Sequence, residues 1–225
     1  MGGKGDVMKK RIGAFALCIV LLFCCSGCGG FKEDGEFTYL LPQNVTSLDP
    51  QTASGSAAGT VIDSIFEGLC RIDQEGETVP GVADRWESND SHTEFTFYLR
   101  SNARWSNGDP VTADDFLFGI TRALSTNSGA LAEDLLPIQN ARAFASGQCE
   151  ESDLGVTALD DHTLVIRLEE SNPDFPSLTA SAHYMPCNRA YFQESAGHYG
   201  LSSQYLITNG PFTFSSMYSW QTDTG

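Results

Sequence analysis

The chain has 225 residues, with 13 lysines and arginines against 29 aspartates and glutamates, and a formal net charge of −16. This length allows one large domain or two small ones, and a hydrophobic share of 41% supports a packed core rather than a disordered tail. The acidic balance argues against nucleic acid and anionic membrane surfaces as partners, because binding to either depends on lysine and arginine.

The N-terminus has the pattern of an export signal. A basic cluster at residues 9–11 is followed by an apolar run at residues 12–25. That run is too short to cross about 30 Å of hydrocarbon as a helix, but it suits the central region of a signal peptide. Met8 lies directly before the basic cluster, so both Met1 and Met8 are candidate first residues of the natural protein.

Cys28 follows two small residues, Ser26 and Gly27, as the lipidated cysteine of bacterial lipoproteins does. Cys25 stands three positions before the cleavage point, where leucine is usual. The resemblance implies a signal peptide over residues 1–27, an acylated Cys28 and a short tether over residues 28–35. An ordinary secretory peptide cut elsewhere and an N-terminal membrane anchor are the alternatives. Removal of residues 1–27 would leave a net charge of −19.

Three cysteines remain after that cleavage: Cys70, Cys149 and Cys187. Because three is odd, they can form at most one disulfide, and the sequence leaves open whether they form any. They contain no C-x-x-C pair, so the sequence gives no support for a zinc or thioredoxin-like site. We therefore expect no metal and no cofactor.

Regular elements are expected along the rest of the chain. Residues 37–41 alternate with period two and predict a strand, while the apolar residues of 61–69 recur at helical spacing. Residues 95–100 alternate again and predict a half-buried strand. Further along, residues 156–168 indicate a hairpin, residues 175–184 a helix, and residues 209–214 a turn followed by a strand.

The segment after residue 100 gives the strongest local signal. The Asn107–Pro110 cluster marks a turn. Thr112 stands three residues before Asp115, as in a capping box, and Val111 and Phe116 are spaced to form a hydrophobic staple. The segment predicts a strand, a turn and a capped helix, and the mixture of elements indicates an α/β or α+β fold.

The sequence indicates no catalytic motif. It contains no G-x-S-x-G, Walker A, H-E-x-x-H or strand-linked G-x-G-x-x-G pattern. His92 and His162 lie in polar turns. His183 is close to Cys187 in sequence, but a nucleophile's base is supplied by the fold rather than by proximity along the chain. The residues predict a secreted, non-catalytic globular protein.

Seven motifs then resemble, in the same order, the N-terminal part of the family 5 extracellular solute-binding proteins, whose best-known members bind oligopeptides for ABC importers. They are Ser47-Leu48-Asp49-Pro50, Ile65-Phe66-Glu67-Gly68-Leu69, Pro80-Gly81-Val82-Ala83 with Trp86, Phe95-Thr96-Phe97-Tyr98-Leu99-Arg100, residues 105–116, residues 158–163, and Asn209-Gly210-Pro211-Phe212.

The resemblance implies an α/β fold with mixed sheets, of the type II periplasmic-binding-protein class, in which two lobes and an extra domain enclose the ligand. It places residues 36–66 and 190–225 in the first lobe and residues 67–189 in the inserted extra domain. The second lobe would follow Gly225, so we expect the chain to be an N-terminal fragment.

The resemblance also implies the ligand and the partners. Ser54, Gly55 and Ser56 would pair through their main chain with an oligopeptide, which a monomeric receptor would deliver to the permease subunits and ATPase of an ABC importer. Oligopeptide binders often carry an acidic residue where Ser54 stands, and a Pro-Tyr pair that residues 128–131 lack. A dipeptide, nickel complex, haem or oligosaccharide ligand therefore stays open, as do a peptide-pheromone receptor and a hydrolase that uses Cys187.

Overall fold

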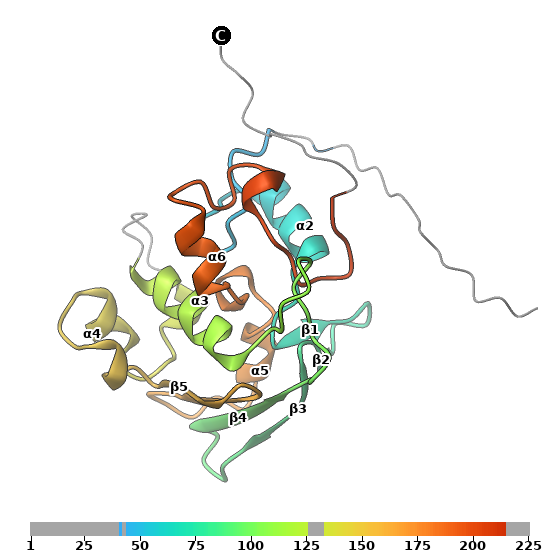
Figure 1. The fold of residues 1–225 in the computed structure, drawn as a ribbon. Coiled ribbons are helices and arrows are strands. Elements are labelled where there is room, and N and C mark those ends of the chain that lie inside the picture. Colours follow the sequence, from blue (N-terminus) through green and yellow to red (C-terminus); the bar gives the residue numbers. More distant parts are fainter. Residues whose placement is uncertain (1–40, 42–43, 126–132, 215–225) are drawn as a thin grey trace, which may run out of the picture. The chain divides into compact units, whose positions relative to one another are not determined.

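The structure is a computed structural model that describes residue 41 and residues 44–125 and 133–214 (Figure 1). The predicted signal peptide and tether with Cys28, most of the predicted strand at residues 37–41, and residues 128–131 lie outside the described residues. No described helix is long and apolar enough to cross a membrane.

The helices are α2 (Ser56–Ile65), α3 (Ala113–Ser125), α4 (Ala141–Ala145), α5 (Phe175–Leu178) and α6 (Arg189–Glu194). The strands are β1 (Cys70–Ile72), β2 (Thr78–Pro80), β3 (Ala83–Ser88), β4 (Glu94–Leu99), β5 (Val156–Asp160) and β6 (Thr163–Arg167).

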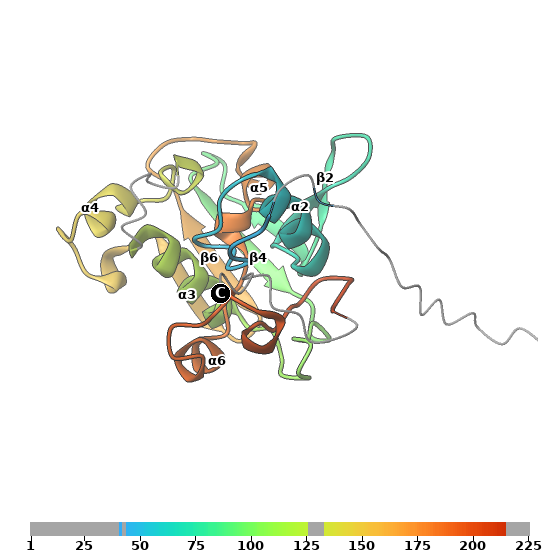
Figure 2. The same ribbon diagram turned by 90° about the horizontal axis from the view of Figure 1, so that it is seen from above.

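Four of these strands form an antiparallel sheet in the order β3-β4-β6-β5, and β1 pairs with β2 in a separate two-stranded sheet. Phe97 lies opposite Trp86 of β3 and Leu164 of β6. Helix α3 lies along one face of the larger sheet, with α2 and α4 on opposite sides of it (Figures 1 and 2). The mixed α/β character expected from the sequence is confirmed.

The buried face of the sheet carries the alternating residues of β4. Phe95, Phe97 and Leu99 are buried, whereas Thr96 and Tyr98 between them are half-buried on the other face. The ring of Phe175 from α5 packs 5.2 Å from that of Phe95, and the ring of Tyr184 lies 5.9 Å from Phe175. Each buried aromatic side chain contributes about 2–3 kcal/mol by leaving water. The predicted half-buried strand is therefore confirmed.

The predicted turn and capped helix are confirmed as well. Thr112 donates its backbone N–H to Oδ2 of Asp115 at 2.9 Å. This is one of the two hydrogen bonds of a capping box, in which the side chain of the third helical residue accepts the N–H of the residue before the helix. Trp105 donates its indole N–H to the same oxygen at 3.1 Å. Val111 and Phe116, the two residues of the predicted staple, are both buried. These contacts fix where α3 begins and how it leaves the turn.

Three sequence predictions differ from the structure. The first helix begins at Ser56 and ends at Ile65, so residues 66–69 are not helical as their spacing suggested, and Phe66 is extended with φ −117° and ψ 158°. Residues 212–214 form no strand, because the backbone of this segment bonds to the end of α2 instead of to a sheet edge. Residues 175–184 divide into α5 and a 3-10 turn at Ala182–Tyr184 rather than one helix.

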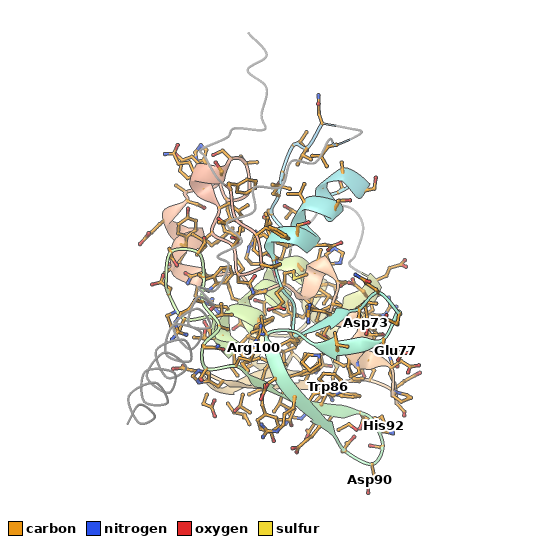
Figure 3. The ribbon with its side chains drawn as sticks, turned by 90° about the vertical axis from the view of Figure 1, so that its right-hand side faces the viewer. Asp73, Glu77, Trp86, Asp90, His92 and Arg100 are labelled. Atoms are coloured by element: carbon orange, nitrogen blue, oxygen red, sulfur yellow. The ribbon has the colours of Figure 1, made fainter. Side chains whose placement is uncertain are left out.

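The two hairpin turns at the edge of the fold are polar. Figure 3 shows Asp73 and Glu77 in the connection between β1 and β2, and Asp90 and His92 at the tip of the β3–β4 hairpin. His92 is exposed, has a φ of 50°, and lies 3.0 Å through Nδ1 from the hydroxyl of Ser88. The prediction that His92 lies in a polar turn is confirmed.

Candidate functional site

The predicted ligand-pairing residues, Ser54, Gly55 and Ser56, lie at the start of α2 and are exposed. Gly55 caps the helix with a φ of 92°, which favours glycine, and no side chain caps the helix there. The first N–H groups of a helix have no partner within the helix. The segment therefore presents backbone groups to solvent rather than a set of chemically specific side chains.

A tight turn over residues 49–53 leads into this segment. The backbone N–H groups of Thr52 and Ala53 both donate to the carbonyl oxygen of Asp49, at 3.0 and 2.8 Å. The N–H of Gln51 donates to Oδ1 of Asp49 at 3.2 Å. Leu48, just before the turn, donates its N–H to the carbonyl of Gly200 at 2.8 Å. Both the backbone and the carboxylate of Asp49 therefore organise the turn.

The carboxylate of Asp49 is bound by Arg122 from the last turn of α3. Nη2 of Arg122 lies 2.7 Å from Oδ2 of Asp49 and Nη1 lies 3.2 Å from Oδ1, a two-point contact. Nη1 also donates to Oε1 of Gln51 at 2.7 Å, and the Gln51 amide donates to the carbonyl of Met185 at 3.0 Å. The Arg122 and Asp49 side chains are only 10% and 7% exposed. This buried cluster joins three segments that are far apart in the sequence.

Aromatic rings and a thiol complete the surroundings of the guanidinium. Its carbon lies 3.9 Å from the ring centre of Phe192 and 5.4 Å from that of Tyr199, and Nη1 lies 3.3 Å from Sγ of Cys187. Burial works against the charged form of Arg122, but the hydrogen bonds and negative charge of Asp49 outweigh it and raise the pKa of Arg122. Arg122 belongs to no motif in the sequence, because the partners that make it important come from other parts of the chain.

The end of α2 is bound to the segment around residue 209. Asn209 accepts the N–H of Glu67 at 3.2 Å and donates to the carbonyl of the same residue at 2.8 Å, while Gly210 donates its N–H to the carbonyl of Ile65 at 2.8 Å. The carboxylate of Glu67 is in turn paired with Arg100, the residue that follows β4. Three of the sequence motifs therefore meet at one junction.

The residues that a Cys–His nucleophile would need bind other partners. Nδ1 of His183 lies 2.8 Å from Oδ1 of Asp134, whose other oxygen accepts a hydrogen bond from Ser181. Cys187 is buried against Arg122, and burial raises the pKa of its thiol to about 11. A thiol with that pKa stays protonated at neutral pH and is a poor nucleophile. This geometry argues against Cys187 as a catalytic residue.

The three cysteines of the described chain, Cys70, Cys149 and Cys187, are free thiols. Cys70 and Cys187 are buried, and burial raises the pKa of Cys70 also to about 11. Among the described residues, no group of three or more His, Cys, Asp or Glu side chains is placed to hold a metal ion.

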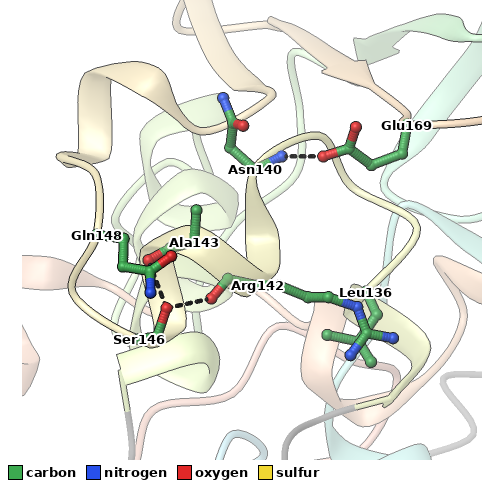
Figure 4. Close-up of a pocket in the computed structure, with 7 residues that line it drawn as sticks. All are labelled: Leu136, Asn140, Arg142, Ala143, Ser146, Gln148 and Glu169. Atoms are coloured by element: carbon green, nitrogen blue, oxygen red, sulfur yellow. Dashed lines mark hydrogen bonds between the residues drawn. The ribbon is translucent and has the colours of Figure 1, made fainter.

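A separate pocket of about 360 Å³ lies beside α4 (Figure 4). Among its lining residues, the N–H of Asn140 donates to Glu169 at 2.7 Å and the Ser146 hydroxyl donates to the carbonyl of Arg142 at 2.8 Å. The lining residues are Leu136, Asn140, Arg142, Ala143, Ser146, Gln148 and Glu169. None of the predicted ligand-pairing residues lines this pocket.

The fold and the motifs together define a solute-binding class of protein. Residues 77–224 match the family described as bacterial extracellular solute-binding proteins, family 5 middle. The match covers more than half of the chain, so the chain belongs to this family. The description of the family names the binding of solutes outside the cell.

Within this class, the chain is similar to several peptide-binding proteins. The chain is 34% identical over 227 residues to the oligopeptide-binding protein OppA of Bacillus subtilis, which covers 95% of the chain and 41% of that protein. It superposes with a TM-score of 0.77 and 34% identity on the substrate-binding domain of an oligopeptide ABC transporter from Bacillus anthracis, over 81% of this chain and 36% of that one. The pheromone receptor PrgZ matches with a TM-score of 0.75 and 30% identity, over 80% of this chain and 36% of that one.

The chain spans 34–41% of the length of the first curated relatives that it matches. Over that length, the similarity to known structures confirms the mixed α/β fold of oligopeptide-binding proteins.

Proposed function

We propose that this chain is part of an extracytoplasmic, lipid-anchored receptor that captures oligopeptides and delivers them to an ABC importer. The observation that carries the proposal is the 34% identity to an oligopeptide-binding protein along 95% of the chain. The permease subunits and the ATPase of the importer are the partners, and no cofactor takes part. Binding rather than catalysis also agrees with the buried, protonated Cys187.

The ligand is held through its main chain at Ser54, Gly55 and Ser56. Backbone pairing of the β type fixes the direction of a peptide while leaving its side chains free to vary. The exposure of all three residues and the uncapped start of α2 support this role. Because the serine side chains carry no charge, we expect little selectivity for the ligand's amino terminus at this position.

The domain division follows the same proposal. Residues 36–66 and 190–225 belong to one lobe, residues 67–189 form the inserted extra domain, and a second lobe of the type II periplasmic-binding-protein class follows Gly225 and closes over the ligand. The hydrogen bonds that tie Ile65 to Gly210 and Glu67 to the Asn209 side chain support the first of these statements. The bond between Gly210 and Ile65 joins the two predicted pieces of the first lobe, and those between Asn209 and Glu67 lie at the boundary of the insertion.

A thermal-shift assay on the complete protein tests peptide binding. A random peptide pool should raise the melting temperature, because a ligand that binds only the folded state stabilises it. Nickel, haem and oligosaccharides, assayed separately, should leave the melting temperature unchanged. If peptides leave the melting temperature unchanged and one of the other compounds raises it, that compound and not a peptide is the ligand.

The lipid anchor is tested by Cys28→Ala in the producing bacterium. The variant should move from the membrane fraction to the soluble or secreted fraction, because the acylated side chain is lost. Cys18→Ala, which changes a cysteine of the apolar run away from the cleavage point, is the matched control and should stay with the membrane. If Cys28→Ala stays with the membrane as well, the lipoprotein assignment is wrong.

A receptor for peptide pheromones is the second candidate, favoured by the structural similarity to PrgZ. The two functions differ in the fate of the peptide. Uptake of a labelled peptide that depends on this protein supports import, whereas a transcriptional response without uptake supports signalling. Genes for a permease and an ATPase beside this one would also favour import.

A further inference from the structure

The turn that precedes Ser54 is organised by hydrogen bonds to Asp49. Residues 49–53 belong to no helix or strand, and the backbone bonds within the turn converge on Asp49. Asp49 is in turn fixed through its carboxylate by Arg122. Ala53, whose N–H donates to Asp49, is the residue immediately before Ser54. Because Asp49 binds Ala53 through its backbone carbonyl, the position of Asp49 bears on the segment that we assign to the ligand.

The guanidinium is suited to fix one position of this turn. Its planar fork binds both oxygens of Asp49 and also reaches Gln51, so it restrains two residues of the turn at once. A lysine ammonium is a point charge on a flexible stem and cannot reproduce such a contact. The Gln51 side chain extends the restraint to the carbonyl of Met185.

We propose that Arg122 is a positioning residue for peptide binding: through Asp49 and Gln51 it holds the turn of residues 49–53, and so the backbone of Ser54–Ser56, in the geometry that pairs with the ligand. The inference rests on the proposed function. A segment that is already ordered loses less conformational entropy when the ligand binds, which increases affinity. Arg122 itself does not touch the ligand.

The test compares wild type, Arg122→Lys and two controls in the complete protein. Peptide affinity is measured by calorimetry with one peptide taken from the pool that binds wild type. Backbone amide exchange is measured in the absence of ligand. Arg122→Lys should weaken binding by about tenfold and speed exchange at Thr52, Ala53 and residues 54–58, while exchange in β4 and β6 stays unchanged.

Two controls separate positioning from general loss of stability. Arg167→Lys makes the same change in an exposed ion pair on the sheet and should change neither readout. Phe175→Leu removes ring packing from the core beneath the sheet and should lower the melting temperature while leaving affinity unchanged. If Arg122→Lys fails to fold, Asp49→Asn combined with Arg122→Gln removes both buried charges and takes its place, with the same expected result.

The outcomes are distinct. Unchanged affinity with Arg122→Lys overturns the inference, even if exchange becomes faster, because the order of the turn would then not matter to the ligand. Weaker binding without faster exchange at residues 52–58 also overturns it. A wild-type protein that binds no peptide contradicts the proposed function itself, and that result is visible before any variant is made.

Discussion

Two arginine–carboxylate pairs in this molecule have the same chemistry and different surroundings. Asp49 and Arg122 are 7% and 10% exposed and join the turn before α2 to the end of α3. Glu94 and Arg167 are 42% and 46% exposed and face each other across β4 and β6, 2.8 Å apart. Both pairs join residues 73 apart in the sequence, but the second lies on strands that are already paired through their backbones.

The comparison teaches that burial, rather than distance, decides what such a pair does. In water, the attraction between two side chains is screened and offset by the entropy of holding them in place. In the interior, a charge without its partner is left with a large desolvation cost. His183 and Asp134, at 36% and 21% exposure, provide an intermediate case.

Arg122→Met should have the largest effect on stability. It leaves the Asp49 carboxylate buried without its counter-charge, so we expect a loss of about 3–5 kcal/mol in the free energy of unfolding. Urea denaturation followed by tryptophan fluorescence measures the loss. A cost below about 1 kcal/mol would mean that the buried pair is no more important than an exposed one.

Gly200→Ala should have the second largest effect on stability, because its new side chain would press on the backbone of Asp49. Gly200 has a φ of 76°, and a Cβ there would lie 2.4 Å from the backbone nitrogen of Asp49. Strained φ and overpacking together should cost at least about 2 kcal/mol. Gly76→Ala is the matched control, since Gly76 has a φ of 86° and open space around it. Equal losses for the two variants would show that the close approach to Asp49 is unimportant.

Asp134→Asn tests the intermediate case through its pH dependence. Burial opposes ionisation of Asp134, but hydrogen bonds from His183 and Ser181 outweigh it and lower the pKa of the carboxyl below its ordinary value of 3.8. A carboxyl with a lowered pKa stabilises the fold above the unfolded-state pKa, and this contribution disappears as the pH falls through the folded-state pKa. The variant should lose about 1 kcal/mol at neutral pH.

The measurement is urea denaturation of wild type and Asp134→Asn between pH 7 and the acid limit of folding. The difference between the two proteins should be fully present above about pH 5 and shrink as the pH falls below that. Glu94→Gln, in an exposed pair, is the control and should show a small difference throughout. A difference for Asp134→Asn that grows toward low pH would contradict the sign of the effect.

Arg167→Met should have the smallest effect, about 0–1 kcal/mol, because its pair with Glu94 is exposed. Raising the salt concentration should reduce even this difference, since salt screens exposed charges. The effect of Arg122→Met should change much less with salt. A large, salt-insensitive loss for Arg167→Met would remove the distinction between the two regions.

Local sequence patterns predicted the segments whose structure depends on near neighbours. The alternation of residues 95–100 gives β4, and Thr112, Asp115, Val111 and Phe116 mark the start of α3, as the structure confirms. The hairpin of β5 and β6 follows from its own turn residues. In each case the deciding interactions lie within a few positions along the chain.

The secondary-structure predictions were wrong where hydrogen bonds to residues far along the chain override the local preference for a helix. The apolar spacing of residues 61–69 predicted that the helix continues to residue 69. Instead, Ile65 and Glu67 form hydrogen bonds with Gly210 and Asn209, more than 140 residues away, and the chain becomes extended after Ile65. The β1, β2 and β3 strands were not predicted, because two are three residues long and the third is mostly polar and exposed.

The sequence by itself determined the family, the acidic character and the strand–turn–helix segment, because motifs and periodicity are properties of neighbouring residues. Only the tertiary structure decided that Arg122 meets Asp49 and Gln51, that Cys187 is a buried thiol beside them, and that His183 pairs with Asp134 instead. The physical reason is that the burial and partners of a charge are set by segments brought together from across the chain.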